Sequence, residues 1–138
     1  MVIYIGGDHR GFRIKESLRA DLLALGYEVV DCGAFAENPH DDYVDFASAV
    51  AEKVSYEADT ARGILVCGSG VGVDVTANKF KKVRSVLGFS NDQVYSARHD
   101  DDVNVLSIAS DFTNEAAAKA MTKVFLETPF GTDERFRR

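Results

Sequence analysis

A strand-length apolar run leads directly into a glycine-rich loop at Gly63-Ile64-Leu65-Val66-Cys67-Gly68-Ser69-Gly70-Val71-Gly72. Residues 64–66 are typical of a buried parallel strand, and residues 73–79 are typical of the helix that follows. Such a unit puts Cys67 at the carboxyl end of a strand, where open α/β sheets bind ligands. The glycines allow a tight turn with bare N–H groups, and a helix N-terminus stabilises nearby negative charge. The stretch therefore predicts an anion-binding loop beside a thiol.

Cys67 also has an ordinary structural interpretation. A cysteine that closes an apolar strand is more often a small core residue than a catalytic group. Alternating glycines likewise occur in many α/β turns, so residues 63–72 alone leave both interpretations open.

Strand-length apolar runs alternate with helical segments along the whole chain. The expected strands cover residues 2–6, 27–31, 63–67, 85–88 and 103–107. The expected helices cover residues 12–25, 43–55, 73–80, 91–98 and 115–127. Ser90 and Gln93 form a capping box for the fourth helix, and Thr113 is the expected N-cap of the fifth. This alternation predicts an α/β fold of three layers (α/β/α), Rossmann-like, with a five-stranded parallel sheet.

The length and composition of the chain fit one packed domain. Its 138 residues are 46% hydrophobic, which suffices for one core but not for two domains. We assign residues 1–128 to a single domain and residues 129–138 to a C-terminal arm that begins at Pro129. We expect this arm to be extended and to pack on a neighbour or stay loose, because it has no core of its own.

Charge and cysteine content disfavour several classes of function. The net charge of −6 and the isoelectric point near 5.0 argue against a nucleic-acid partner, which requires a basic face. No apolar run is long enough for a membrane span or a targeting segment. The two cysteines, Cys32 and Cys67, fit a reducing compartment better than a disulfide framework. We therefore expect a cytoplasmic protein without nucleic-acid or membrane partners.

Another strand runs into a polar, glycine-flanked turn at Ile3-Tyr4-Ile5-Gly6-Gly7-Asp8-His9-Arg10-Gly11-Phe12. This turn precedes the Cys67 loop, Ala77-Asn78-Lys79 and Asn104-Val105-Leu106. In these motifs and their spacing, the chain from about residue 2 to residue 135 resembles the ribose-5-phosphate isomerase B family, which includes the galactose-6-phosphate isomerase subunits. The resemblance implies an aldose–ketose isomerase of a small sugar phosphate, with ribose 5-phosphate and ribulose 5-phosphate as the first choice.

The resemblance also gives roles to residues of both loops. It implies that Cys67 is the base that moves a proton between C2 and C1 through an enediolate, without a cofactor or a metal. Ser69 would be a further hydrogen-bond donor or a proton shuttle, although a serine here also suits a simple turn. Asp8 and His9 would contact the ring oxygens and the phosphate region, and Asp8 also suits the N-cap of the first helix. The enediolate oxygen would bind the backbone N–H groups of Gly68, Gly70, Val71 and Gly72.

One segment departs from the family pattern at catalytic positions. The family usually carries Arg-x-His-Asn-Asp-x-Asn, whose histidine opens the sugar ring and whose first asparagine holds the enediolate oxygen. Here the segment reads Arg98-His99-Asp100-Asp101-Asp102-Val103-Asn104. Alignment on its two ends puts Asp100 in the place of the histidine and Asp101 in that of the asparagine. Asp100 can act as a carboxylate base for ring opening. A gapped alignment would give this role to His99, but adjacent helix residues point about 100° apart.

The phosphate-binding positions of the family are also altered. Asp111 replaces an arginine that usually follows the Asn-Val-Leu strand, and the C-terminal Arg-His-x-x-Arg clamp reads Arg135-Phe136-Arg137-Arg138. Arg135 keeps its position, and Arg137 or Arg138 would replace the missing second arginine. With aspartates at positions 100–102 and 111 expected near the site, a phosphate would bind less well than in typical members.

The resemblance implies a homodimer with shared active sites, in which the arm brings Arg135 to the neighbouring subunit; a tetramer or a heteromer stays open. The alternatives are the cysteine-bearing subunit of a heteromeric galactose-6-phosphate-type isomerase, an isomerase of a tetrose, hexose or unphosphorylated sugar, and a non-catalytic sugar-binding descendant. The spacing of Gly6, Gly7 and Gly11 disfavours a dinucleotide-binding enzyme. A metal site built from residues 99–102 is disfavoured because consecutive residues cannot all face one ion.

Overall fold

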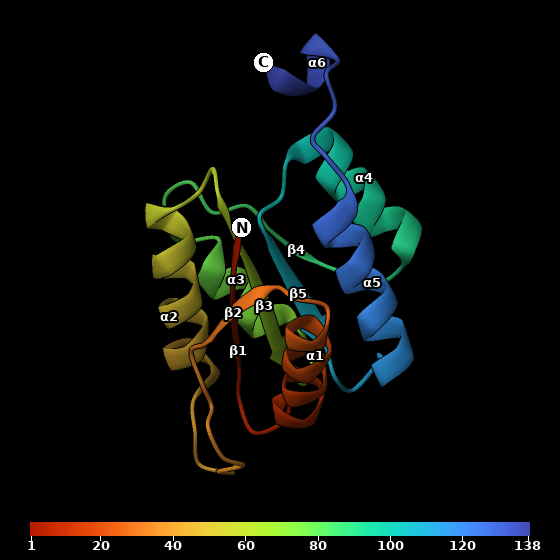
Figure 1. The fold of residues 1–138 in the computed structure, drawn as a ribbon. Helices are drawn as coiled ribbons and strands as arrows, with labels where there is room; N and C mark the ends of the chain where they lie inside the picture. The colour runs from red at the N-terminus through yellow and green to blue at the C-terminus, as the bar shows by residue number, and fades with distance from the viewer.

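Parallel strands form a five-stranded sheet in the computed structural model, which describes residues 1–138 (Figure 1). The order across the sheet is β2-β1-β3-β5-β4, so the chain moves outward from β1 to one edge and then returns through β3 to the other. This order places β1 and β3 side by side, with Ile5 paired to Ile64. The strands are β1 (Val2–Gly7), β2 (Glu28–Asp31), β3 (Ala61–Cys67), β4 (Ser85–Leu87) and β5 (Val105–Ala109).

Helices cover both faces of this sheet, because the central strands are apolar on both sides. Ile64 and Val66 of β3 join a core cluster with the helices α1, α4 and α5, whereas Leu65 and Cys67 join a second cluster with α2 and α3. The helices are α1 (Phe12–Ala24), α2 (Tyr43–Tyr56), α3 (Val71–Ala77), α4 (Asn91–Asp101), α5 (Glu115–Glu127) and α6 (Glu134–Arg137). The predicted three-layer α/β/α class with a five-stranded parallel sheet is confirmed.

Two elements, α3 and β5, begin at other residues than the sequence predicted, because Gly70 and Asn104 belong to the turns that precede them. Helix α3 begins at Val71, two residues earlier than predicted, because Gly70 at φ 73° makes the turn that precedes it. Strand β5 begins at Val105, two residues later than predicted. The Asn104 side chain before it bonds to the preceding loop instead: Oδ1 accepts from the Arg84 N–H (2.8 Å) and Nδ2 donates to the Lys82 carbonyl (2.8 Å).

The predicted caps are partly right. Ser90 Oγ accepts from the Gln93 N–H (3.1 Å), as expected, and Gln93 Oε1 accepts from the N–H of Phe89, one residue before the cap. Thr113 is not the N-cap of α5: Asn114 takes that position, and its Oδ1 accepts from the Ala117 N–H (2.8 Å). A carboxamide one residue closer to the helix reaches the free amides better than the threonine hydroxyl.

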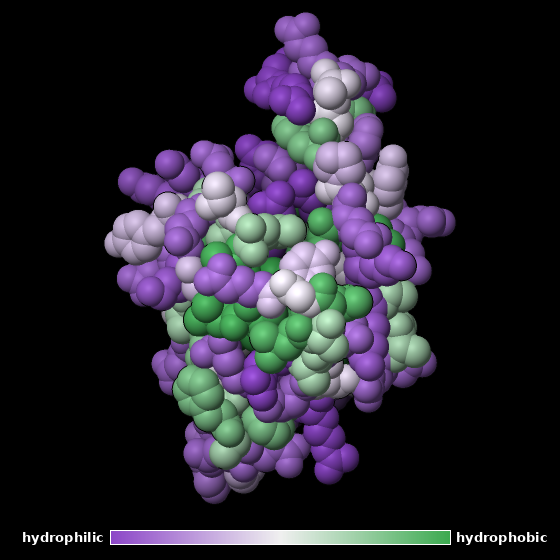
Figure 2. Space-filling model, in the orientation of Figure 1, coloured by the Kyte–Doolittle hydropathy of each residue, from purple (hydrophilic) through white to green (hydrophobic).

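The C-terminal arm is not extended as predicted, because α6 forms a short helical turn within it. The Gly131 N–H donates to the His99 carbonyl (2.8 Å), so the arm is attached to the end of α4. Figure 1 and Figure 2 show the arm projecting from the end of the molecule at which the strands begin, beyond a largely polar face with an apolar band across its middle. None of the helices combines the length and the apolar character needed to cross a membrane.

Candidate active site

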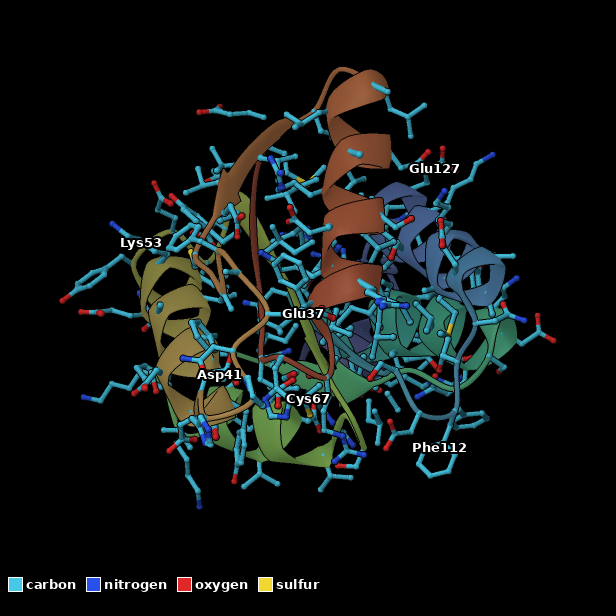
Figure 3. The ribbon with its side chains drawn as sticks, turned by 90° about the horizontal axis from the view of Figure 1, so that it is seen from below. Glu37, Asp41, Lys53, Cys67, Phe112 and Glu127 are labelled. Carbon is cyan, nitrogen blue, oxygen red and sulfur yellow. The ribbon has the colours of Figure 1, made fainter.

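A pocket of about 280 Å³ lies at the carboxyl edge of the sheet, where β1 and β3 end. Figure 3 views the molecule from this side and labels Cys67. The loops that follow the two neighbouring strands therefore supply most of its wall, and the start of α2 closes it. The lining residues are Asp8, Arg10, Tyr43, Cys67, Gly68, Ser69, Val71 and Gly72.

Cys67 is the last residue of β3 and is 4% exposed. Its carbonyl accepts from the N–H (2.9 Å) and the hydroxyl (3.1 Å) of Ser110, which ties the end of β3 to the loop after β5. The thiol thus belongs to the core cluster and also lines the pocket. A core role and a role in chemistry are compatible at this position.

The loop after Cys67 offers unused donors. No backbone carbonyl accepts from the N–H groups of Gly68, Ser69 or Gly70, and Gly68 and Ser69 line the pocket. Val71 differs, because its N–H donates to Ser69 Oγ (3.2 Å). The Ser69 side chain therefore supports the turn, and the Val71 amide becomes free only if that side chain rotates.

Asp8 and His9 lie at the same edge as Cys67, as predicted, and Asp8 lines the same pocket. Asp8 is not the N-cap of α1: Gly11 holds that position without a side-chain cap, and Asp8 Oδ1 accepts from the Gly11 N–H (3.0 Å). Two bonds fix His9 to Asp41, whose Oδ1 accepts from the His9 N–H (3.0 Å) and lies 2.7 Å from Nδ1.

Asp41 is a site residue that the sequence analysis missed. Its side chain is 8% exposed, and its second oxygen, Oδ2, is buried without a partner. Asp41 lies 32 residues from His9, between the predicted strand 27–31 and the predicted helix 43–55, so no local pattern indicated the pair. The fully buried Lys15 helps to place that loop, because its Nζ donates to Asp31 Oδ1 (2.9 Å) and to the Ala34 carbonyl (2.6 Å).

Arg10 and Tyr43 were also missed, although both line the pocket. The Tyr43 ring lies against Gly72, where an added Cβ would come within 2.7 Å of it. Arg10 forms an ion pair with Asp111 at the pocket mouth. The only sequence signal for Arg10 was its place in the turn after β1, and Tyr43 was read simply as the start of a helix.

His99, Asp100 and Asp101 lie elsewhere, at the end of α4 and thus at the edge where the strands begin. His99 Nδ1 is 2.8 Å from Asp100 Oδ1, and the ring contacts Tyr95 and, edge-on, Phe136 of the arm. The expectation that aspartates 100–102 lie near the Cys67 site is wrong within one chain. Helix α4 starts near the carboxyl edge and runs back to the opposite one.

Arg135 and Arg138 belong to this distant end as well, because α6 lies in the arm attached to α4. The Arg135 side chain pairs with Asp133 (3.5 Å) and is 72% exposed. One chain therefore carries two separate groups of predicted site residues, one around Cys67 and one around His99 and the arm.

The chain matches a family model described as Ribose/Galactose Isomerase over residues 3–138. It belongs to this family. The probable ribose-5-phosphate isomerase B of Mycoplasma genitalium is 38% identical over 136 residues, covering 99% of this chain and 90% of the relative. The ribose-5-phosphate isomerase B of Mycolicibacterium paratuberculosis is 33% identical, covering 100% and 86%.

Solved structures agree with this assignment. The Mycoplasma genitalium ribose-5-phosphate isomerase B with bound ribulose-5-phosphate superposes with a TM-score of 0.95 at 37% identity, covering 99% of this chain and 90% of that one. The type B ribose 5-phosphate isomerase of Trypanosoma cruzi gives 0.93 at 34% identity, covering 100% and 92%. The predicted family, fold and enzyme class, an aldose–ketose isomerase, are confirmed.

Proposed function

We propose that this chain interconverts ribose 5-phosphate and ribulose 5-phosphate through an enediolate, with Cys67 as the base. The observation that carries the proposal is that Cys67 lines a pocket together with Gly68 and Ser69, whose N–H groups have no carbonyl partner. The relative from Mycoplasma genitalium, which has the same fold, is described with ribulose-5-phosphate bound.

The proton transfer balances without any other reactant. The Cys67 thiolate takes the proton from C2 of the open-chain aldose, and the electron pair forms the C1–C2 double bond while negative charge moves to O1. The thiol then returns the proton to C1. Transfer of the O2 proton to O1 completes the ketose, and the Ser69 hydroxyl is suited to carry it. Positioned proton transfer of this kind accelerates reactions by about 10²- to 10⁴-fold.

The enediolate needs donors aimed at its charged oxygen. We assign this role to the N–H groups of the loop from Gly68 to Gly72, among which those of Gly68 and Ser69 line the pocket without a carbonyl partner. Asp8 is suited to contact the sugar hydroxyls, because one carboxylate oxygen is fixed by Gly11 while the side chain lines the pocket. His9, held by Asp41, would face the phosphate region.

A second copy of the chain would complete the site. His99, Asp100, Asp101, Arg135 and Arg138 are at the far end of the chain from Cys67, so they act on the substrate only if a partner presents them. We therefore propose a homodimer with shared sites, in which the partner's Asp100 opens the ring and the partner's Asp101 and arm contact the substrate. We further propose that the enzyme works in the cytoplasm, in keeping with its two free cysteines.

Activity of Cys67 variants tests the proposed base. Cys67→Ala should lower kcat on ribose 5-phosphate by at least about 10²- to 10⁴-fold, with the fold retained by circular dichroism. Cys32→Ala is the matched control: burial and the nearby Asp31 carboxylate raise the pKa of Cys32, which keeps it a neutral thiol, and its kcat should not change. Similar activity of Cys67→Ala and the wild type would refute the assignment.

A different sugar is the second candidate. The aspartates at 100 and 101 alter the positions that the family resemblance assigns to ring opening, which favours a substrate that does not cyclise readily, such as a tetrose phosphate. Rates should be measured for the purified chain alone on four- to six-carbon sugars with and without phosphate. A tetrose phosphate that outpaces ribose 5-phosphate would replace the first candidate, and no turnover without an added sister chain would favour a heteromeric enzyme.

A further inference from the structure

Arg10 is the only lysine or arginine among the residues that line the Cys67 pocket. The proposed proton transfer does not involve this side chain. A sugar phosphate brings a dianion into this pocket, whose other charged wall residue is the carboxylate Asp8. The cations of the arm, Arg135 and Arg138, lie at the opposite end of the chain, so they reach this pocket only from a partner subunit.

The structure fixes Arg10 in the pocket from two sides. Its guanidinium lies against Gly68, where an added Cβ would come within 2.1 Å of Cζ, so this approach requires a glycine. Its carbonyl lies 2.9 Å from Ser110 Oγ, which is 3.1 Å from the Cys67 carbonyl, so the two carbonyls share the single proton of that hydroxyl. The position of the Arg10 backbone is therefore coupled to that of the proposed base.

Asp111 holds the guanidinium at the pocket mouth. The Asp111 carboxylate forms an ion pair with Arg10, and the Asp111 backbone N–H donates to the Gly68 carbonyl (2.9 Å). The two side chains are 52% and 40% exposed. An ion pair this exposed contributes little to stability, so its exchange for another anion is energetically inexpensive.

We propose that Arg10 binds the phosphate group of the substrate, and that the phosphate replaces Asp111 on the guanidinium. The planar guanidinium presents paired N–H donors that match phosphate oxygens, which a point charge does not. Asp111 then acts as a competing anion that orients Arg10 before the substrate binds and weakens phosphate binding. This inference deepens the proposed isomerase function and rests on the same pocket.

Binding measurements separate this role from catalysis. Calorimetric titration with inorganic phosphate and with ribose 5-phosphate should show affinity falling about 10- to 100-fold in Arg10→Ala and less in Arg10→Lys. Asp111→Asn should raise the affinity by up to about fivefold, because the competing charge is gone. Arg13→Ala is the matched control, since Arg13 is 89% exposed and pairs with Glu37, outside the pocket; its affinity should not change.

Opposite effects of the two partners distinguish the proposal from a structural role. If Arg10 and Asp111 only stabilise the loop, both variants bind phosphate more weakly, and the proposal is wrong. Equal KM changes of Arg10→Ala on a phosphorylated sugar and its unphosphorylated analogue, or a loss in kcat alone, would also overturn it. A further outcome separates this inference from the proposed function. If the wild-type chain binds phosphate through Arg10 but does not isomerise ribose 5-phosphate, the proposed substrate is wrong and this inference stands.

Discussion

Gly70→Ala tests whether the turn after Cys67 requires a glycine, both for its backbone conformation and because neighbouring atoms leave no space for a Cβ. Gly70 has a φ of +73° and precedes α3. A left-handed residue with a Cβ costs about 1–2 kcal/mol. The added Cβ would also lie 2.5 Å from Leu87 Cδ1 and 3.0 Å from the Ala109 backbone nitrogen. Overpacking of that kind costs about 1–3 kcal/mol. The free energy of unfolding should fall by about 2–5 kcal/mol.

Gly26→Ala separates the two contributions. Gly26 has a φ of +91°, but a Cβ there would meet nothing within 4 Å. The free energy of unfolding of Gly26→Ala should therefore fall only by the cost of the left-handed backbone, about 1–2 kcal/mol. Any gain from a stiffer unfolded chain is common to both variants and cancels in their difference. The expected difference between them is about 1–3 kcal/mol.

Urea unfolding followed by circular dichroism measures both free energies, and steady-state kinetics follows the site. The displaced turn should lower kcat in Gly70→Ala, because the Ser69 and Gly70 amides belong to it, whereas Gly26→Ala should keep the wild-type kcat. Equal stability losses in the two variants would show that the contacts with Leu87 and Ala109 carry no cost. The steric part of the reasoning would then be wrong.

Two further predictions follow from side-chain pairs. Asp41→Ala removes the acceptor shared by the backbone and ring N–H of His9, so stability should fall by about 1–3 kcal/mol and KM for ribose 5-phosphate should rise with little change in kcat. An unchanged KM would show that substrate binding does not need this pair. The hydrogen bond to Glu57 raises the pKa of Tyr4 from 10.0 to about 12. The native state holds the Tyr4 hydroxyl proton more tightly than the unfolded state does. The contribution of the Tyr4–Glu57 pair to the free energy of unfolding is therefore present below pH 10 and lost as the pH rises towards 12. Between these pH values the unfolding free energy of Tyr4→Phe should fall less steeply than that of the wild type.

The sequence by itself predicted the layers of this fold because they depend on local patterns. Apolar runs of strand length, such as residues 64–66, and the helical segments between them alternate regularly, and this order specifies a parallel sheet with helices on both faces. Since parallel strands end at one edge, the chain order also put Asp8 and Cys67 at that edge. Caps were predicted less well, as at Asn114, because one residue decides which side chain reaches the free amides.

Only the tertiary structure decided which side chains meet in the pocket and which do not. His9 pairs with Asp41 across 32 residues and Arg10 with Asp111 across 101, and both pairs depend on how loops pack rather than on any periodic pattern. The separation of His99 from Cys67 has the same origin. A helix that follows a strand must run back to the opposite edge, so the residues at the end of α4 lie away from the edge that holds Cys67. Local pattern specifies elements and their order, whereas the contacts between distant segments come from packing in three dimensions.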